Sequence, residues 1–328
     1  MQKRTISLLG IPIWENRYRK GGEDYLLFSC LRVHRKEYNK TRLFKQKEIP
    51  LSNKIFSIDD TQIINELKAL GSFSYQPNDG NMGDALIADV TMRWMDMNHL
   101  PWRRLKKSEQ PENIVYGGGG IWTPDYIKGT HAIMQKMQHA KRVVILPSSF
   151  RDVPELVRIL DERFVVFCRE KVSYDYLCAQ HTGARILLDH DMAFRANVVK
   201  KPAWWKTLKK NRYIRKLQAE IASVSSEPHF YRTDAESTSC RVGSELDISS
   251  FMGWFRPGDS RAKYELGAWA LCSALAGFDH IYTDRLHVGI AAMLCGVRVT
   301  YRDNSYGKIL AVYEQSLKEV KLVKITGA

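Results

Sequence analysis

Several side chains that can carry protons or bind anions lie close together near the C-terminal end of the sequence. Arg285 and His287 are separated by one residue, Lys308 follows further on, and Asp284 and Asp303 stand beside them. Histidine can hold or release a proton near neutral pH, and arginine and lysine bind phosphate and carboxylate groups. The set predicts a site where a proton carrier meets an anionic ligand. The alternative is structural, with Arg285 paired to Asp284 and His287 packed in a helix.

The elements that must position these residues can be read from the apolar pattern of the same stretch. Residues 280–283 are β-prone, 288–294 are small and apolar, and Gly296 stands where a helix C-cap glycine would. A second apolar run at 297–301 and a second helical pattern at 306–317 follow. This β-α-β-α order predicts parallel strands, whose ligands bind beyond the carboxyl ends.

The length and the composition of the chain limit the classes of protein to which it can belong. The chain has 328 residues, of which 44% are hydrophobic and 26% are charged, which suits two globular α/β domains. No apolar run approaches the roughly 18 residues of a membrane span. The apolar run at the N-terminus is too short for the core of a signal peptide. We therefore expect a cytoplasmic protein. The six cysteines show neither CxxC nor metal-ligand spacing, so we predict buried thiols and no metal site.

The positive charge is concentrated in two segments. Residues 1–50 hold 12 Lys and Arg against 5 Asp and Glu, and residues 200–218 hold 8 Lys and Arg with no acid. These two segments account for the whole net charge of +14, so the rest of the chain is close to neutral. Local basic segments indicate an acidic surface, and we expect peripheral contact with the inner face of the cell membrane. No nucleic-acid-binding motif is present, so we expect no nucleic-acid partner.

The pattern divides the chain into four parts. Residues 1–57 predict a basic N-terminal β-hairpin and a linker, and residues 58–194 predict an N-terminal α/β domain. Residues 195–226 form a basic, aromatic linker whose apolar residues spread around a helical wheel, which argues against an amphipathic helix. Such a linker either lies on a membrane or is solvated with buried tryptophans. Residues 227–328 predict a smaller C-terminal α/β domain.

The predicted strands of the first domain end repeatedly in glycine or polar residues. Asn81 and Asp84 lie in a glycine-containing turn that opens a helix, where backbone N–H groups face a ligand. Four glycines at 117–120 follow another strand and indicate close approach of a ligand to the main chain, or otherwise a flexible loop. Arg169 and Asp191 follow two further strands. Parallel strands would bring all of these to one edge.

Taken together, the motifs resemble those of the polysaccharide pyruvyl transferase family over roughly residues 72–317. The motifs are Asn81-x-Gly83-Asp84, the glycine run, Arg169-Glu170-x-x-Ser173, Asp191-Met192-Ala193, Arg232-x-Asp234-x-Glu236, and Arg285-Leu286-His287 followed by Asp303 and Lys308. The resemblance implies two Rossmann-like domains in a GT-B-like arrangement. It implies transfer of pyruvate from phosphoenolpyruvate to a sugar diol of a surface or exopolysaccharide repeat unit, giving a cyclic ketal.

The resemblance also assigns roles to particular residues. It makes Arg285 and His287 catalytic and implicates Arg169 in phosphate binding. The predicted substrate-binding residues are Arg169, Ser173, Arg232, Lys308, Asn81, Asp84, Gly118, Gly119 and Asp191.

The predicted chemistry suits these residue types. A donor with a carboxylate and a phosphate needs several cations, and histidine suits delivery of a proton to carbon. The sequence leaves the base open among Asp84, Asp191 and Asp234. The reaction needs no cofactor.

Two other functions remain open at this point. A GT-B glycosyltransferase would use the same site for a nucleotide sugar, and a non-catalytic homologue would only bind a saccharide. A donor screen separates the first, and turnover with phosphate release excludes the second. The saccharide acceptor, which we expect to be carried on a lipid, is not specified by the sequence.

Overall fold

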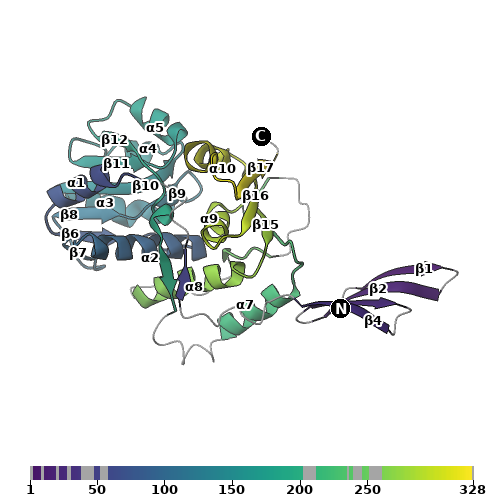
Figure 1. Cartoon of the computed structure of the whole chain (residues 1–328). Helices are drawn as coiled ribbons and strands as arrows, with labels where there is room; N and C mark the ends of the chain where they lie inside the picture. Colours follow the sequence, from purple (N-terminus) through teal and green to yellow (C-terminus); the bar gives the residue numbers. More distant parts are fainter. Residues whose placement is uncertain are drawn as a thin grey trace.

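The computed structural model contains two α/β units and a separate small sheet, which Figure 1 draws apart from them. It describes residues 3–8, 11–19, 22–27, 31–37, 48–51, 58–201, 212–234, 236–238, 246–250 and 261–326. Both α/β units are built on parallel strands, which confirms the predicted class. No helix in these ranges is long and apolar enough to cross a membrane.

The larger sheet is entirely parallel and runs in the order β12-β11-β10-β8-β6-β7, with β9 also beside β10. Its strands are β6 (Phe73–Gln76), β7 (Trp102–Arg104), β8 (Asn113–Tyr116), β9 (Gly119–Trp122), β10 (Arg142–Phe150), β11 (Phe164–Cys168) and β12 (Arg185–Leu188). Alternate residues of β10 serve two cores: Val143 and Ile145 face one, and Val144 and Leu146 face the other. The sheet is therefore covered on both sides, as continuous apolar strands require.

Helices from the same half of the chain cover the two faces. They are α1 (Thr61–Ala69), α2 (Met82–Met97), the 3-10 turn at Ile127–Thr130, α3 (His131–His139), α4 (Pro154–Val157), α5 (Lys171–Cys178) and the 3-10 turn at Met192–Arg195. The first two contribute to one core, and α3, α4 and α5 contribute to the other. Helix α2 begins at Met82, directly after its N-cap residue Asn81.

The smaller sheet is also parallel, in the order β14-β15-β16-β17. Its strands are β14 (His229–Phe230), β15 (His280–Thr283), β16 (Arg298–Arg302) and β17 (Val323–Thr326). Its helices are α8 (Arg261–Leu275), α9 (Leu286–Leu294), α10 (Lys308–Val312) and the π-helical turn Tyr313–Leu317. This confirms the predicted β-α-β-α order, and Gly296 follows α9 with a φ of 80°.

One apolar core joins the two units. Helix α2 contacts both α8 and α9, and buried side chains such as Trp94, Trp269 and Ile290 belong to one continuous cluster. The two sheets are thus held against each other by an apolar interface, and their strand ends face a shared space (Figure 1).

The N-terminal segment differs from its prediction. Each half of the expected hairpin forms two strands, which gives one antiparallel sheet in the order β1-β2-β3-β4. The strands are β1 (Lys3–Leu8), β2 (Ile11–Arg19), β3 (Gly22–Leu27) and β4 (Leu31–Glu37). Strand β2 pairs antiparallel with β3, and residues 20 and 21 between them lie outside the described residues.

The two predicted linkers contain regular structure. Strand β5 (Glu48–Pro50) pairs antiparallel with β13 (Val198–Lys200), so the first linker meets the second. Helix α7 (Arg212–Ser223) follows, and it buries Ile214, Leu217 and Ile221 while Arg215 and Lys216 are exposed. The prediction of no amphipathic helix is therefore wrong for this stretch. Residues 202–211 of that linker lie outside the described residues.

Candidate active site

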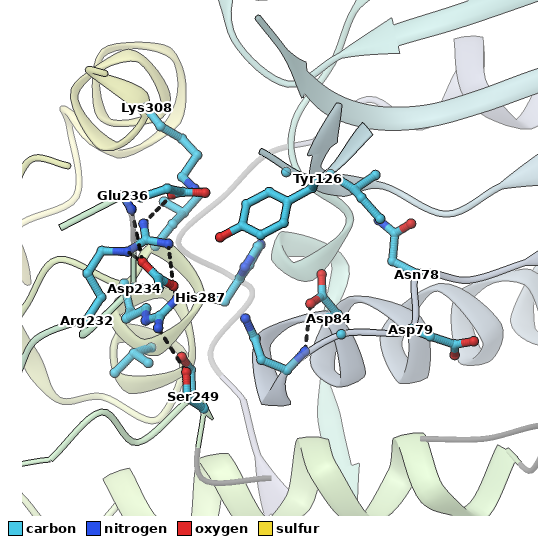
Figure 2. A pocket seen from close by; sticks show the side chains of 18 of the residues that line it. Asn78, Asp79, Asp84, Tyr126, Arg232, Asp234, Glu236, Ser249, His287 and Lys308 are labelled. Atoms are coloured by element: carbon cyan, nitrogen blue, oxygen red, sulfur yellow. Dashed lines mark hydrogen bonds and ion pairs between the residues drawn. The ribbon is translucent and has the colours of Figure 1, made fainter. Parts of the chain in front are cut away.

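A cavity of about 390 Å³ opens between the carboxyl ends of the two parallel sheets. Figure 2 shows Asn78, Asp79 and Asp84 on one side, Arg232, Asp234, Glu236 and Lys308 on the other, and Tyr126 between them. The predicted site residues that line it are Asn81, Asp84, Arg169, Arg232, Arg285, His287 and Lys308. Residues from the strand ends of both halves of the chain therefore line one cavity.

The Asn81-x-Gly83-Asp84 motif builds the start of helix α2. The side chain of Asn81 accepts a hydrogen bond from Gly83 N at 2.7 Å, and Asp84 Oδ2 accepts from Asn81 N at 2.9 Å. This reciprocal pair is a capping box. Gly83 is required because a Cβ there would lie 2.7 Å from the Cβ of His287. The motif therefore lets the first turn of α2 pack against the histidine.

The glycine run brings the main chain close to its neighbours and to the cavity. A Cβ at position 118 would lie 2.5 Å from the carbonyl oxygen of Pro147, so Gly118 serves close backbone packing. At position 120 a Cβ would lie 3.2 Å from Arg169 Nη2 and 3.7 Å from Lys308 Nζ. Within the described part of the chain, Gly120 lines the cavity and Gly118 and Gly119 do not. The predicted glycines Gly118 and Gly119 thus pack against their neighbours, whereas Gly120 is the glycine of the run that borders the cavity.

Arg169 lies at the end of β11 and is 1% exposed. Its Nε donates to Ser149 Oγ at 2.8 Å, and its Nη1 donates to Asp191 Oδ2 at 2.7 Å. Asp191 also lies 3.3 Å from His287 Nε2 and caps the following 3-10 turn through Ala193 N at 2.9 Å. Burial raises the pKa of the Asp191 carboxyl, but His287 and Arg169 outweigh it and hold the pKa below its usual range.

Asp191 does not line the cavity in the described part of the chain. Its position behind Arg169 and His287 makes it the residue that orients both of them. The sequence predicted Asp191 as a substrate ligand. In the structure its carboxylate contacts Arg169 and His287, which themselves line the cavity.

Ser173 is likewise not among the described residues that line the cavity. Its hydroxyl accepts from Phe150 N at 2.6 Å and from Arg151 Nη1 at 2.8 Å, and its own N donates to Glu170 Oε2 at 2.8 Å. Glu170 is the N-cap of α5. The Glu-x-x-Ser part of the motif therefore fixes the turn that follows Arg169, and contact of Ser173 with a substrate stays a prediction.

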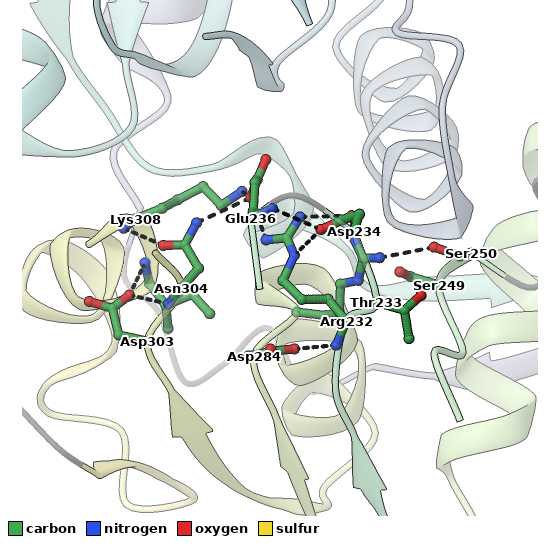
Figure 3. Close-up of polar contacts among 12 residues, drawn as sticks. Arg232, Thr233, Asp234, Glu236, Ser249, Ser250, Asp284, Asp303, Asn304 and Lys308 are labelled. Carbon is green, nitrogen blue, oxygen red and sulfur yellow. Dashed lines mark hydrogen bonds and ion pairs between the residues drawn. The ribbon is translucent and has the colours of Figure 1, made fainter. Parts of the chain in front are cut away.

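Four side chains form a network on the side of the smaller sheet, of which Arg232, Glu236 and Lys308 are buried (Figure 3). Arg232 Nε donates to Asp234 at 2.6 Å, and Arg232 also pairs with Glu236. Lys308 Nζ donates to Glu236 Oε2 at 2.6 Å. Burial lowers the pKa of the Lys308 ammonium to about 8, against the opposing attraction of Glu236. Glu236 thus holds two cations at the cavity wall.

Arg285 is held by two acids and a hydroxyl. It lies 2.8 Å from Asp234, its Nε donates to Asp247 at 3.1 Å, and it donates to Ser250 Oγ at 2.9 Å. Asp284 instead accepts from Arg232 N at 2.7 Å. The structural alternative, in which Arg285 pairs with Asp284, is therefore not what the structure shows: the partners of Arg285 lie further away in the sequence.

Sequence reasoning missed several residues that line the cavity, namely Asn78, Asp79, Tyr126, Ser249 and Ser250. Tyr126 is the most prominent, because it is 36% exposed and projects between the two walls (Figure 2). Burial raises its pKa to about 12, with Glu236 and Asp234 adding to the effect, so its hydroxyl stays protonated at neutral pH. No pattern in the loop that carries it distinguishes it from other surface tyrosines.

The arrangement provides four cations and one histidine around a small volume. In the ligand-free protein these cations are balanced by Asp191, Asp234, Glu236 and Asp247. An anionic ligand must therefore bind by sharing cations that already have acid partners, which favours a compact, highly charged group over a single carboxylate. Among the described residues, no group of three or more His, Cys, Asp or Glu is placed to hold a metal ion.

Comparison with known proteins places the chain in a family. A solved structure of a functionally uncharacterised protein from Klebsiella pneumoniae subsp. pneumoniae is similar, with 26% identity and a TM-score of 0.61 over 82% of this chain and 98% of that one. No curated protein matches the chain. The polysaccharide pyruvyl transferase family model matches residues 81–306, from the cap of α2 to a point two residues before Lys308. The chain therefore belongs to the polysaccharide pyruvyl transferase family.

Proposed function

We propose that this protein transfers pyruvate from phosphoenolpyruvate to two hydroxyl groups of a saccharide and forms a cyclic pyruvate ketal. The saccharide would be part of a surface or exopolysaccharide repeat unit, carried on a lipid. In this proposal the two parallel sheets act as a GT-B-like pair, with the donor bound between their strand ends.

The observation that carries the proposal is the cradle around Gly120. Arg169 Nη2 and Lys308 Nζ converge on the space that a Cβ of residue 120 would occupy, at 3.2 Å and 3.7 Å. Two cations from different sheets, facing a main-chain segment without a side chain, suit a phosphate group. Arg285 and Arg232 lie across the same cavity and are the candidates for the donor carboxylate.

The donor chemistry follows from these positions. His287 is the group proposed to give a proton to the methylene carbon, which makes the central carbon electrophilic. Arg169 and Lys308 would stabilise the phosphate as it leaves, as preorganised cations do at a developing charge. Asp191 keeps His287 in place and balances the charge when the ring is protonated.

The acceptor would lie on the opposite wall. Asn78 and Asn81 present amides there, and Tyr126 presents an exposed ring between the walls. Amides and aromatic rings together suit a neutral, hydroxyl-rich ligand, whereas the cations face the donor side. We also propose that the protein works at the cytoplasmic face of the membrane, with its basic segments near lipid head groups.

Donor binding tests the proposal against the two alternatives. Phosphoenolpyruvate at millimolar concentration should raise the melting temperature, and UDP-sugars and GDP-sugars should not, because the cavity suits one compact anion. Activity should survive EDTA. Stabilisation by a nucleotide sugar without stabilisation by phosphoenolpyruvate would instead indicate glycosyl transfer. Binding of phosphoenolpyruvate without phosphate release in the presence of any saccharide would indicate a non-catalytic homologue.

A further inference from the structure

The carboxylates around the cavity differ in what holds them. Asp191 pairs with Arg169 at 2.7 Å, Asp234 with Arg232 at 2.6 Å, and Glu236 with Lys308 at 2.6 Å. Each of these carboxylates is therefore in an ion pair with an arginine or a lysine. A carboxylate held by an arginine or lysine is a weak proton acceptor, because the cation favours the charged form.

Asp84 is the exception on the cavity wall. Within the described residues, no salt bridge of 4.0 Å or less involves it, and its recorded hydrogen bond is the one from Asn81 N to Oδ2 at 2.9 Å. Its other oxygen lies 3.5 Å from the position of a Cβ at Gly119, and Asp84 itself lines the cavity. Figure 2 shows the carboxylate directed into the space below Tyr126.

Asp79 is the other acid on this wall, and its surroundings differ. It accepts a hydrogen bond from the hydroxyl of Tyr264, is exposed to solvent, and points away from the cavity residues in Figure 2. Asp84 is therefore the acid placed to meet a ligand on the acceptor side.

We infer that Asp84 is the general base that takes the proton from the attacking hydroxyl of the acceptor saccharide. The inference rests on the proposed pyruvyl transfer and names a catalytic residue for it. Asp84 lies one residue after Gly83, which packs closely against His287, so the proposed base and acid line the same cavity.

The electrostatic surroundings of Asp84 agree with this geometry. Burial raises the pKa of the Asp84 carboxyl, while the charges of His287, Arg169 and Lys308 oppose the rise. A raised pKa makes the carboxylate a better proton acceptor than a solvent-exposed aspartate. His287 and Asp84 then divide the acid and base roles between them.

The chemical step balances with these two groups. His287 gives a proton to the methylene carbon, an acceptor oxygen bonds to the central carbon, and Asp84 removes the hydroxyl proton. The second hydroxyl then bonds to the same carbon, and the bond from carbon to phosphate breaks. The diol loses two protons in total. One restores the proton that His287 gave to the methylene carbon, and the other leaves with the phosphate. No oxidant, reductant or further reactant is required.

Asp84 also caps α2, so the test must separate charge from folding. Asp84→Asn keeps an oxygen that accepts from Asn81 N, and removes only the basic charge. Asp59→Asn is the matched control, because Asp59 accepts from Thr61 N at 2.9 Å at the start of α1 and lies outside the cavity. Turnover would be measured as phosphate release from phosphoenolpyruvate with methyl glycosides of glucose, galactose and mannose, and with water in their place.

The expected result is a turnover about 10²–10³-fold lower in Asp84→Asn, with donor affinity and melting temperature close to wild type. The rise of turnover with pH that Asp84 sets in the wild type should be lost in this variant. Added formate should partly restore turnover in Asp84→Ala, which a capping role would not explain.

Asp84→Asn with turnover close to wild type across the pH range would overturn the inference. If Asp84→Asn does not remain folded, the effect of formate on Asp84→Ala is the deciding measurement. A turnover of Asp84→Ala that formate does not raise would contradict the role of Asp84 as the general base. A wild-type chain that releases no phosphate with any of these nucleophiles contradicts the proposed function itself. An active wild type with an active Asp84→Asn contradicts only the role of Asp84.

Discussion

The carboxylate of Asp191 lies 2.7 Å from the guanidinium of Arg169, and both side chains are almost completely buried. The same carboxylate lies 3.3 Å from His287 on α9. Arg169 follows a strand of the larger sheet, whereas His287 follows a strand of the smaller one. One buried acid thus joins the proposed donor-binding arginine to the proposed proton donor across the interface between the two sheets.

Asp191→Asn should destabilise the fold by about 3 kcal/mol, because it leaves Arg169 buried without its counter-charge. The folded-state pKa of Asp191 is depressed, so its contribution is present above the unfolded pKa of about 4 and is lost as pH falls. Urea unfolding at several pH values checks this: the gap between variant and wild type should shrink in acid. Asp175→Asn, which removes an exposed pair with Lys171, should change stability by less than about 0.5 kcal/mol. A gap that stays constant down to pH ~2 would contradict the assignment.

His287→Ala should lower turnover by at least about 10²-fold while phosphoenolpyruvate still binds, as expected for removal of a general acid. Calorimetry measures the binding, and phosphate release measures the turnover. His139→Ala on the exposed side of α3 is the control and should behave as wild type. Near-normal turnover of the His287 variant would end its assignment as the proton donor.

Gly120→Ala should abolish donor binding without unfolding the protein, because the new methyl group enters the space between Arg169 and Lys308. Gly129→Ala is a matched control: its added Cβ would meet nothing within 4 Å, and neither glycine has a positive φ. Thermal melts with and without phosphoenolpyruvate compare the two variants. Equal ligand-induced stabilisation in both would show that the phosphate lies elsewhere.

Donor affinity should fall as pH rises above about 8, because the Lys308 ammonium then loses its proton and its attraction for the donor. The phosphate is already fully ionised above about pH 7, so it should not contribute to this change. Lys308→Arg keeps its charge throughout and should flatten the profile between pH 7 and 9. A wild-type affinity that is independent of pH in this range would mean that Lys308 does not touch the donor.

Neutralising the eight basic residues at 200–218 should weaken binding to anionic vesicles and leave activity on a soluble acceptor intact. Salt should weaken vesicle binding of the wild type, because exposed charges are screened. Co-sedimentation with phosphatidylserine vesicles, compared with neutral vesicles, measures the effect. Vesicle binding that responds neither to the substitutions nor to salt would show that the charge serves another purpose.

The sequence placed residues at strand ends where one rule of sheet geometry applies. Parallel strands place their carboxyl ends on one edge, so Arg232 and Arg285 were expected at the edge of one sheet and Arg169 at the edge of another, and only the family resemblance joined the two sets. The same rule cannot tell a residue that faces the ligand from one behind it. Ser173 and Asp191 follow the right strands, but backbone N–H groups and buried cations occupy their oxygens.

The contacts that loop residues make could not be predicted from the sequence. Tyr126 and Asp247 have no periodic pattern, and their places depend on how the two sheets face each other. The prediction against an amphipathic helix is wrong because it treats residues 195–226 as one helix. The amphipathic helix is α7, which occupies only the second half of that stretch. The pattern predicted one strand and a basic tail in each half of the N-terminal segment, whereas each half forms two strands.

The most direct test of the account is the fate of phosphoenolpyruvate labelled with carbon-13 at its methylene carbon. The full chain would be incubated with the labelled donor and a panel of free and lipid-linked saccharides, and the products followed by NMR together with released phosphate. The account predicts that the methylene signal is replaced by the methyl signal of a ketal attached to a saccharide, with an equal amount of phosphate. A methylene signal that remains unchanged, with no ketal formed on any acceptor, would contradict it.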